Sequence, residues 1–384
     1  MKNKFLAVGL TLALGAGMAL SGCGDNQVNA SVTTEVSPTA IELVAAPVMQ
    51  YMQSADDVAV STIQQQFGYT RGNRFDRGLP VTISYDLQTE KGVGLEYATV
   101  KVFEKGNKTA FSRVQIGADS HYAQIYNLKT DAEYTYSFVF RLTNGKSVIR
   151  EGEFSTEKSP RFMYVDGASN VRDIGGWNST LGGKIKQGVL YRGSEIDGLK
   201  NKGVDGFTIS EKGIETMLSV MGIRTDFDLR NPAEIGVDKN SAGILGETVQ
   251  RTFLPSAYYE QILNQPQTLK TVFSALADEN AYPAYLHCTH GVDRAGTLSL
   301  VLEALLGVEK ADLIRDYELS NFFYPEDKVD RYYDANGGDI LTLISKLESD
   351  YEGETLADKT ADMLIKAGVT ADQIALIRSI FIEI

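Results

Sequence analysis

The feature that most constrains how this chain can fold is the stretch 284–297, in which a short apolar segment leads through a polar loop into an apolar helix. The apolar segment ends at His287 and Cys288, five residues separate Cys288 from Arg294, and the apolar run 298–308 follows. A strand–loop–helix of this kind collects the amides of its loop at a helix N-terminus, where an anion is favoured. We therefore predict an anion-binding loop with a thiol at its floor.

Composition limits the partners and cofactors of the chain. Its 384 residues and 43% hydrophobic content suffice for two domains with separate cores. The formal net charge of -13 leaves no basic stripe to neutralise phosphates, which argues against a nucleic-acid partner. The sequence has two cysteines and three histidines, and two of the histidines lie in the thiol loop. We therefore expect neither a disulfide scaffold nor a bound metal or other cofactor.

The N-terminus has the order of an export signal. Residues 1–4 carry positive charge, residues 5–19 are apolar or small, and Leu-Ser-Gly-Cys23 follows at once. The apolar run is too short for a comfortable transmembrane helix. The whole resembles a bacterial lipoprotein signal, which implies that residues 1–22 are removed and that Cys23 is lipidated. It also implies an exported protein that acyl chains anchor on the extracytoplasmic side of a membrane.

Two regions follow the signal. Residues 23–37 are polar and are predicted to form a flexible tether. Residues 38–157 are predicted to form a β-sandwich, because short β-branched and aromatic segments alternate with period two between turn signals. The beginning of this region is less regular. Residues 41–44 fit a first strand, residues 44–56 fit a short helix equally well, and residues 61–78 fit a long loop.

Part of the predicted sandwich resembles a known domain. The string 126–136 and the segment 152–156 resemble fibronectin type III domains, in which a Leu before a turn and a Tyr entering the next strand pack in the core. The alternating aromatic residues at 134–140 fit one buried face or a carbohydrate platform, and we favour the buried face. Nothing in this region looks catalytic, so spacing or partner binding is its expected role.

Residues 158–384 change to a mixed α/β pattern after a polar hinge. Strands are expected at 162–166, 189–192, 223–229, 248–253 and 284–287. Helices are expected at 211–221, 266–278, 296–306, 310–319 and from 339 to the C-terminus, with a capping box at 370–373. Helices that alternate with strands predict a central sheet covered on both faces.

Five segments of this second region resemble, in order, the tyrosine and dual-specificity phosphatase superfamily, and within it the bacterial tyrosine-phosphatase family. The segments are 170–176, 183–194, 222–230 with Glu234, the Cys288 loop and 316–321. The resemblance implies an α/β tyrosine-phosphatase fold with a central sheet flanked by helices. It also implies hydrolysis of a phosphomonoester through a cysteinyl-phosphate.

A phosphomonoester is a stable dianion, so its hydrolysis needs a nucleophile, charge compensation and a proton for the leaving oxygen. Cys288 is the candidate nucleophile, and Arg294 can grip two phosphoryl oxygens with its planar guanidinium. Gly291 permits a backbone conformation that a side chain would obstruct. The expected phosphate-binding loop consists of Thr289, His290, Gly291, Val292, Asp293 and Arg294.

The proton donor has two candidates. The resemblance implies that Asp293 is the general acid. Asp228 is the rival acid, although Asp228 and Arg230 also fit an ion pair that positions the end of a strand. His287 is expected to orient the loop by hydrogen bonding rather than to carry a proton.

Polar residues of the first matching segment form a further candidate group. Asn170, Arg172 and Asp173 lie close together ahead of a glycine pair. They fit two roles about equally, lining the mouth of the site or stabilising a turn. We keep Arg172 and Asp173 as supporting residues.

The loop departs from the family pattern at two positions. Val292 stands where the family usually has Lys, which predicts weaker recognition of doubly phosphorylated or inositol-lipid substrates. Ala295 stands where most members have Ser or Thr, and Thr297 follows two residues later. His290 fits either a replacement charge at the rim or an exposed histidine with no partner.

The sequence therefore predicts a phosphomonoester hydrolase that acts on phosphotyrosine in proteins or on a small phosphomonoester. Two alternatives remain open. One is a phosphatase for inositol phosphates or phosphoinositides, and the other is a catalytically weak lipoprotein that binds a phosphate ligand.

Overall fold

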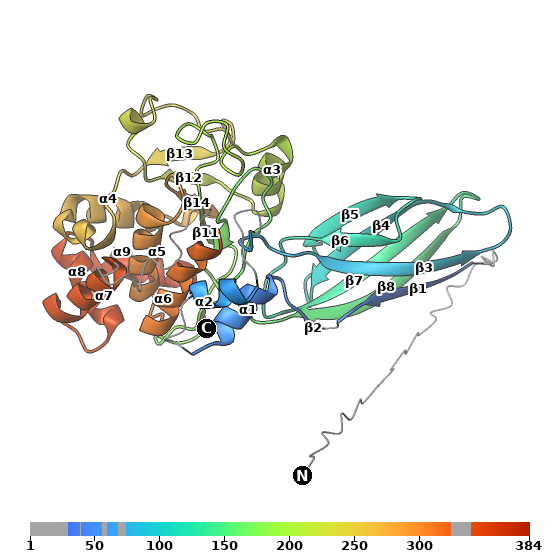
Figure 1. Cartoon of the computed structure of the whole chain (residues 1–384), viewed down its shortest axis with the longest axis horizontal. Helices are drawn as coiled ribbons and strands as arrows, with labels where there is room; N and C mark the ends of the chain where they lie inside the picture. The colour runs from blue at the N-terminus through green and yellow to red at the C-terminus, as the bar shows by residue number, and fades with distance from the viewer. Residues whose placement is uncertain (1–29, 39, 56–59, 68–73, 324–338) are drawn as a thin grey trace, which may run out of the picture.

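The computed structural model describes residues 30–38, 40–55, 60–67, 74–323 and 339–384. These residues form two parts that lie side by side, an elongated all-β part and a rounder α/β part (Figure 1). The predicted signal, Cys23 and residues 24–29 lie outside the described residues. Within the described ranges, no helix has the length and hydropathy needed to cross a membrane.

The all-β part, which we call the two-sheet domain, consists of two sheets around one apolar core. One sheet has the order β1 (Ala30–Val36), β3 (Val81–Thr89) and β6 (Tyr122–Ile125). The other has the order β2 (Ala40–Ile41), β8 (Ser147–Thr156), β7 (Ala132–Leu142), β4 (Leu95–Glu104) and β5 (Ser112–Gly117).

Strand β7 shows why these residues form a strand with one buried face. Tyr134, Tyr136, Phe138 and Phe140 occupy every second position, and their side chains are at most 5% exposed. Successive side chains of a strand point to opposite faces, so all four aromatic rings enter the core. The interpretation of these rings as a buried face is confirmed.

Two predicted boundaries near the N-terminus are wrong. Residues 30–36, predicted as tether, form β1, which pairs antiparallel with β3 along its whole length. Residues 46–53 and 60–66 form helices α1 (Ala46–Gln53) and α2 (Val60–Gln66), so the long loop expected at 61–78 begins as a helix.

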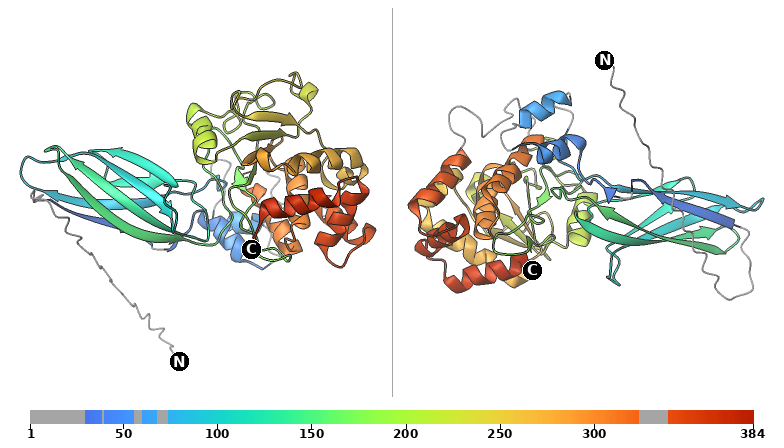
Figure 2. Two further views of the ribbon diagram at one scale, coloured as in Figure 1. Left: turned by 180° about the vertical axis from the view of Figure 1, so that it is seen from behind. Right: turned by 90° about the horizontal axis from the view of Figure 1, so that it is seen from below.

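These two helices belong to the α/β domain. Val48, Tyr51, Val60 and Ile63 are buried in the core of that domain, and Figure 2 shows α1 and α2, in blue, beside its orange helices. Both helices were predicted to belong to the sandwich, whose bounds were placed at residues 38–157. The contacts that place them elsewhere are long-range and are not encoded in a local pattern.

The α/β domain is built on a five-stranded sheet with β14 (Ala284–His287) at its centre. The strand order is β13 (Gln250–Phe253), β12 (Thr225–Asp228), β14, β11 (Leu190–Gly193) and β9 (Arg172–Asp173), with only β9 antiparallel to its neighbour. Asp228 and Gly193 both lie opposite His287. The carboxyl ends of three parallel strands therefore meet where Cys288 follows β14, the edge at which open α/β sheets bind ligands.

Helices cover both faces of this sheet. On one face, α5 (Asp293–Leu305) packs against β11 and β14. The apolar core of that face also includes residues of α4 (Pro266–Leu276), α6 (Lys310–Glu318), α7 (Asp339–Asp350), α8 (Leu356–Lys366) and α9 (Ala371–Phe381). The other face carries Tyr191 and Tyr285, which share a core with Met217 and Met221. These methionines come from the helix made of α3 (Glu211–Glu215) and the π-helical segment Thr216–Val220, which Met221 ends. The expectation of a sheet covered on both faces is confirmed.

Most predicted elements occur near their expected places. The capping box at Thr370 and Gln373 is present. The strand expected at 162–166 is wrong, because only an isolated bridge from Phe162 to Arg172 forms there. The region after 339 forms α7, α8 and α9, and a short strand Ile382–Glu383 then pairs with Lys184–Ile185.

A buried arginine joins the two domains. Arg161 donates to Leu128 O at 3.0 Å and to Asn127 O at 2.8 Å in the two-sheet domain, and to Asp173 Oδ2 at 2.7 Å in the α/β domain. The side chain of Asn127 adds a bond in each direction with the backbone of Tyr164. Asp173 also accepts from two backbone amides and is buried. The turn-stabilising interpretation therefore holds for Asp173, and the idea that it lines the mouth of a site is wrong.

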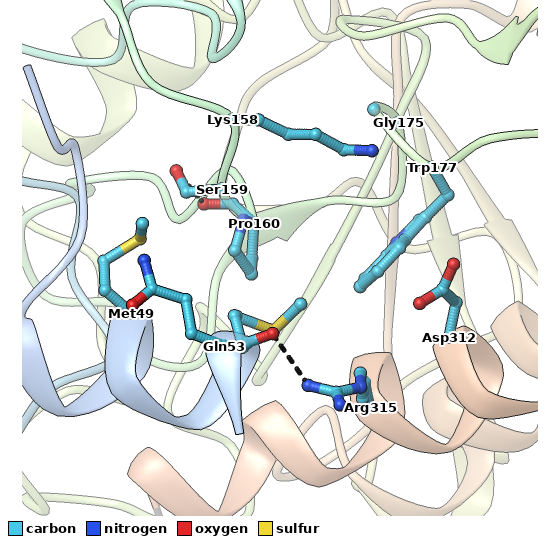
Figure 3. A pocket seen from close by; sticks show the side chains of 11 residues that line it. Met49, Gln53, Lys158, Ser159, Pro160, Gly175, Trp177, Asp312 and Arg315 are labelled. Atoms are coloured by element: carbon cyan, nitrogen blue, oxygen red, sulfur yellow. Dashed lines mark hydrogen bonds between the residues drawn. The ribbon is translucent and has the colours of Figure 1, made fainter. Parts of the chain in front are cut away.

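A cavity of about 370 Å³ lies beside this junction. Its lining includes Lys158 and Pro160 of the hinge, Trp177 and the end of α1 (Figure 3). Arg315 of α6 forms part of the wall and donates to Tyr51 O and Met52 O at the end of α1. Trp177 is the only tryptophan of the sequence, so its fluorescence reports on this junction.

Candidate active site

The predicted loop lies between the central strand and the buried helix α5. Cys288 follows β14 directly, its side chain is 3% exposed, and it carries a free thiol. Gly291 has φ of 72°, and a Cβ atom there would lie 2.3 Å from the carbonyl carbon of Gly193. Only glycine fits this position, as the sequence predicted.

The backbone carbonyls of the loop are held from outside. Each of four consecutive carbonyls accepts a hydrogen bond: Cys288 O from His287 Nδ1 at 3.1 Å, Thr289 O from the Glu195 amide at 3.0 Å, His290 O from Asn170 Nδ2 at 3.2 Å and Gly291 O from Arg192 Nη2 at 3.0 Å. In a planar trans peptide the N–H of the next residue points the opposite way. The amides of residues 289–292 are therefore turned toward the inner side of the loop, which is the arrangement an anion site needs.

Arg192 belongs to a buried charged cluster behind the loop. Asp316 of α6 accepts from Arg192 Nη1 at 2.8 Å and from Arg172 Nε at 3.1 Å. Burial alone would raise the pKa of Asp316, but the two guanidinium groups outweigh it and the pKa is lowered. Burial lowers the pKa of Arg192 to about 10, so it stays charged at neutral pH. Burial also raises the pKa of Glu303 on α5 well above its ordinary value.

Arg172 is therefore a supporting residue, although not at the mouth. Its side chain is fully buried, and besides Asp316 it contacts Asn170 Oδ1 at 2.7 Å. No role was predicted from the sequence for Arg192 or Asp316. A signal was present, because Arg192 is a charged residue in a strand whose residues are all buried. Such a residue needs a partner.

Asn170 connects the loop to the N-terminal part of the chain. Its backbone is in the left-handed region, with φ of 54°, and its amide donates to Asp76 Oδ2 at 2.7 Å. Asp76 is 1% exposed and also accepts from Arg74. Asp76 therefore fixes the residue that holds His290 O. Nothing in the local sequence around Asp76 points to this contact.

Arg294 lies at the rim of the loop with its guanidinium engaged by a carboxylate. Its Nη1 and Nη2 atoms donate to the two oxygens of Glu234 at 2.9 and 3.1 Å, and Nη2 lies 3.4 Å from Thr289 Oγ1. The hydrogen bond from Arg294 lowers the pKa of Glu234. Glu234 belongs to one of the five matching segments, and no role was predicted for it from the sequence. Its place indicates that it orients Arg294.

Asp228 and Arg230 form an ion pair, which was one of the two roles predicted for Asp228. Asp228 is fully buried and accepts from Arg230 and Arg251, and Arg230 also donates to Glu195 and Asp197. Burial acts to raise the pKa of Asp228, but His287 and the guanidinium groups outweigh it and lower the pKa. A carboxyl that holds its charge so firmly is a poor proton donor, so the rival interpretation of Asp228 as the acid is disfavoured.

His287 makes a hydrogen bond of the kind expected for a residue that orients the loop. Its ring stacks on Tyr285, Nδ1 binds Cys288 O, and Nε2 lies 3.0 Å from Asp226 Oδ1 in an ion pair. Burial acts to lower the pKa of His287, but Asp228 and Asp226 outweigh it, so the pKa is raised. The ring is 1% exposed, and its Nδ1 atom reaches the loop at the Cys288 carbonyl.

Asp293 is the first residue of α5 and lies in a network of hydroxyl groups. Tyr259 Oη donates to Asp293 Oδ1 at 2.5 Å, and Tyr317 Oη lies 3.0 Å from Tyr259 Oη. The hydroxyl of Thr297 donates to Asp293 O at 2.8 Å and accepts from the Tyr259 amide at 2.7 Å. Thr297 is therefore engaged within α5 and with Tyr259. Neither Tyr259 nor Tyr317 was given a role from the sequence.

The two unusual loop residues are buried. Val292 and Ala295 are at most 1% exposed and belong to the core beneath the loop. Val292 therefore presents its amide, rather than its side chain, to an anion. His290 is half-buried with its ring 5.4 Å from that of Phe207, so the interpretation of an exposed histidine without a partner is wrong.

Taken with the fold, this thiol, the inward amides and the nearby arginine place the chain in a class of proteins. It belongs to the tyrosine phosphatase family, whose model matches residues 163–363, just over half of the 384 residues. The resemblance found in the sequence is thereby confirmed at the level of the family.

Relatives from two bacteria are similar to this chain. A putative tyrosine-protein phosphatase of Cupriavidus necator is 25% identical over 182 residues, covering 41% of this chain and 63% of the relative. A tyrosine-protein phosphatase of Nostoc commune is 26% identical over 137 residues, covering 30% of this chain and 47% of the relative. The chain thus spans about half to two thirds of the length of these curated relatives.

One solved structure was also compared. It is the core catalytic domain of the PP-IP phosphatase SIW14 from S. cerevisiae in complex with citrate, with 14% identity and a TM-score of 0.25. The match covers 43% of this chain and 92% of that chain.

Proposed function

We propose that this protein is a cysteine-dependent phosphatase that hydrolyses phosphomonoesters, with phosphotyrosine in proteins as the preferred substrate class. The observation that carries the proposal is the Cys288 thiol at the floor of a loop whose four carbonyls are bonded outward. Family membership and the names of the relatives support the same chemistry.

The proposed reaction has two steps. The thiolate of Cys288 attacks phosphorus, the P–O bond to the leaving group breaks, and Asp293 transfers its proton to the leaving oxygen. The amides of residues 289–292 and the guanidinium of Arg294 stabilise the charge on the phosphoryl oxygens. Water then attacks the phosphorus of the cysteinyl-phosphate while the Asp293 carboxylate takes up a proton from it; the S–P bond breaks, phosphate is released, and the thiolate and the protonated Asp293 are restored.

The test compares the wild type with Cys288→Ser on an aryl phosphate, with no metal added. We expect the serine variant to lose at least about a thousandfold in rate, because serine is a far weaker nucleophile at neutral pH. Arg294→Lys keeps the charge but cannot bind two oxygens, and we expect it to lose rate mainly through weaker substrate binding. A wild type that hydrolyses the aryl phosphate no faster than Cys288→Ser would refute the proposed enzymatic activity.

Substrate panels separate the remaining alternatives. Faster turnover of phosphotyrosine peptides than of inositol phosphates or phosphoinositides supports the proposal. The opposite order indicates an inositide phosphatase, and tight phosphate binding without turnover indicates a phosphate-binding lipoprotein. The buried Val292 supports the first outcome, because the loop lacks the Lys side chain that the family usually has there.

We further propose that the protein is an exported, lipid-anchored protein. The order of charge, apolar run and Leu-Ser-Gly-Cys23 supports this. Metabolic labelling with a fatty acid should mark the wild type but not Cys23→Ala. We also propose that the two-sheet domain is fibronectin III-like and acts as a spacer or partner-binding module, which its two facing sheets and shared core support.

A further inference from the structure

Tyr259 has a backbone conformation that is unusual for its residue type. Its φ is 56°, in the left-handed region. In the described part of the chain, the other non-glycine residues with positive φ are Asn127, Asp131 and Asn170, whose short polar side chains tolerate that region. A tyrosine does not favour it, and strained residues of this kind gather at functional sites.

The contacts of Tyr259 explain what holds it there. Its amide donates to Thr297 Oγ1 at 2.7 Å, and Thr297 donates in turn to Asp293 O at 2.8 Å. Its hydroxyl donates to Asp293 Oδ1. Tyr259 therefore binds the first turn of α5 through its backbone and the Asp293 carboxyl through its side chain.

Tyr317 supports this contact from α6. Its hydroxyl lies 3.0 Å from that of Tyr259 and its side chain is 1% exposed. The single hydroxyl proton of Tyr259 is used toward Asp293, so Tyr317 donates to Tyr259. The ring of Tyr317 packs on Gly296, where a Cβ would lie 2.6 Å from its Cε2 atom. The pair of tyrosines is thus fixed against the helix that carries Asp293.

We propose that Tyr259 is a positioning residue for the general acid Asp293. This inference rests on the proposed function and adds to it a residue that neither the matching sequence segments nor the loop contains. The bond to Oδ1 fixes the rotation of the carboxyl group and so orients Oδ2 toward the leaving oxygen. The Oδ2 proton passes to that oxygen as the P–O bond breaks, and Tyr259 keeps its own proton throughout.

The test uses Tyr259→Phe, which keeps the ring and removes the hydroxyl. The value of kcat/KM is measured for 4-nitrophenyl phosphate, whose leaving group departs without a proton, and for phenyl phosphate, whose leaving group needs one. General acid catalysis contributes about 10²–10⁴ in rate, and we expect the variant to lose about tenfold on phenyl phosphate and less than about twofold on 4-nitrophenyl phosphate.

Two comparisons separate positioning from a general structural effect. Tyr282→Phe removes another buried hydroxyl, which donates to Leu276 O at 2.6 Å, and should change both substrates equally little. In an Asp293→Asn background, Tyr259→Phe should cause no further loss that depends on the leaving group. Competitive inhibition by inorganic phosphate should be unchanged in Tyr259→Phe, because the loop amides are untouched.

The outcomes distinguish this inference from the proposed function. Equal losses on both substrates, or no loss on either, would overturn the role of Tyr259 while leaving a Cys288-dependent phosphatase in place. An additional leaving-group effect in the Asp293→Asn background would overturn it too. A wild type without Cys288-dependent activity would remove both proposals.

Discussion

Several side chains of this site bind and orient other groups of the same site. Asn170 and Arg192 hold loop carbonyls, and Glu234 holds the guanidinium of Arg294. Preorganised groups of this kind accelerate a reaction because they need not rearrange as charge develops. We therefore expect few residues to bind an anion directly. A larger number of residues orient the ones that do.

Glu234→Ala tests the orientation of Arg294. Without the paired carboxylate the guanidinium can rotate away from the loop, and we expect kcat/KM for an aryl phosphate to fall about tenfold, which corresponds to about 1.4 kcal/mol. Steady-state kinetics measure this change. Glu215→Ala, an exposed glutamate of α3, is the matched control and should have no effect. Equal activity of Glu234→Ala and wild type would contradict the orienting role.

Residues of the loop could be predicted because strand, loop and helix follow one another in the sequence. Cys288 and Gly291 lie between β14 and the helix α5, and Arg294 is the second residue of α5, so all three fall within seven positions. Asp76 and Tyr259 could not be predicted, because each reaches the loop through a contact that joins distant parts of the chain. A burial pattern shows which face of an element is covered, not what covers it.

At the scale of elements, the segment containing α1, α2 and Asp76 completes a domain that begins, by the family match, at residue 163. Arg315 of α6 binds carbonyls at the end of α1, and Tyr51 of α1 donates to Glu318. In the chain, this segment of the α/β domain thus lies between strands β2 and β3 of the two-sheet domain, and the rest of the α/β domain follows β8.

Asp76→Ala tests whether this N-terminal piece supports the loop. The Asn170 amide would lose its buried acceptor, and a group left unsatisfied in this way costs about 1–3 kcal/mol. We expect kcat/KM to fall about tenfold and phosphate inhibition to weaken, with Asp76→Asn intermediate.

The control for this prediction is Asp166→Ala, which removes a carboxylate that accepts from Ser210 Oγ at 2.6 Å at the start of α3. It should lower thermal stability without weakening phosphate inhibition. If both aspartate variants affect inhibition to the same degree, Asp76 has no specific effect on the loop.

On the scale of the whole molecule, the junction between the domains is buried and charged. Arg161→Ala would leave Asp173 buried without its guanidinium, and breaking a buried ion pair typically costs about 3–5 kcal/mol. We expect a large loss of unfolding free energy in urea, together with a change in Trp177 fluorescence. Lys184→Ala removes an exposed pair with Asp131 across the same junction and should cost at most about 1 kcal/mol. Similar losses in the two variants would contradict a rigid junction centred on Arg161.

The pH dependence of stability follows from the buried network around the sheet. Asp228 and Asp316 have lowered pKa values, so they contribute stability above their unfolded pKa near 3.9, and this is lost as the pH falls through their folded pKa. His287 has a raised pKa, so its contribution is present below about 6.5 and is lost as the pH rises through its folded pKa. Urea unfolding across pH should show a maximum between these limits. A stability that increases steadily below pH 4 would contradict the assignment.

The proposed reaction requires that Cys288 forms a covalent bond to phosphorus. The most direct measurement is rapid acid quenching of the wild type during turnover of a radiolabelled aryl phosphate, in the absence of metal, followed by mapping of the label. We predict that the label is found on the peptide that contains Cys288 and that Cys288→Ser carries none. Turnover of the substrate with no label on that peptide, or with the label on another residue, would show that Cys288 is not the nucleophile.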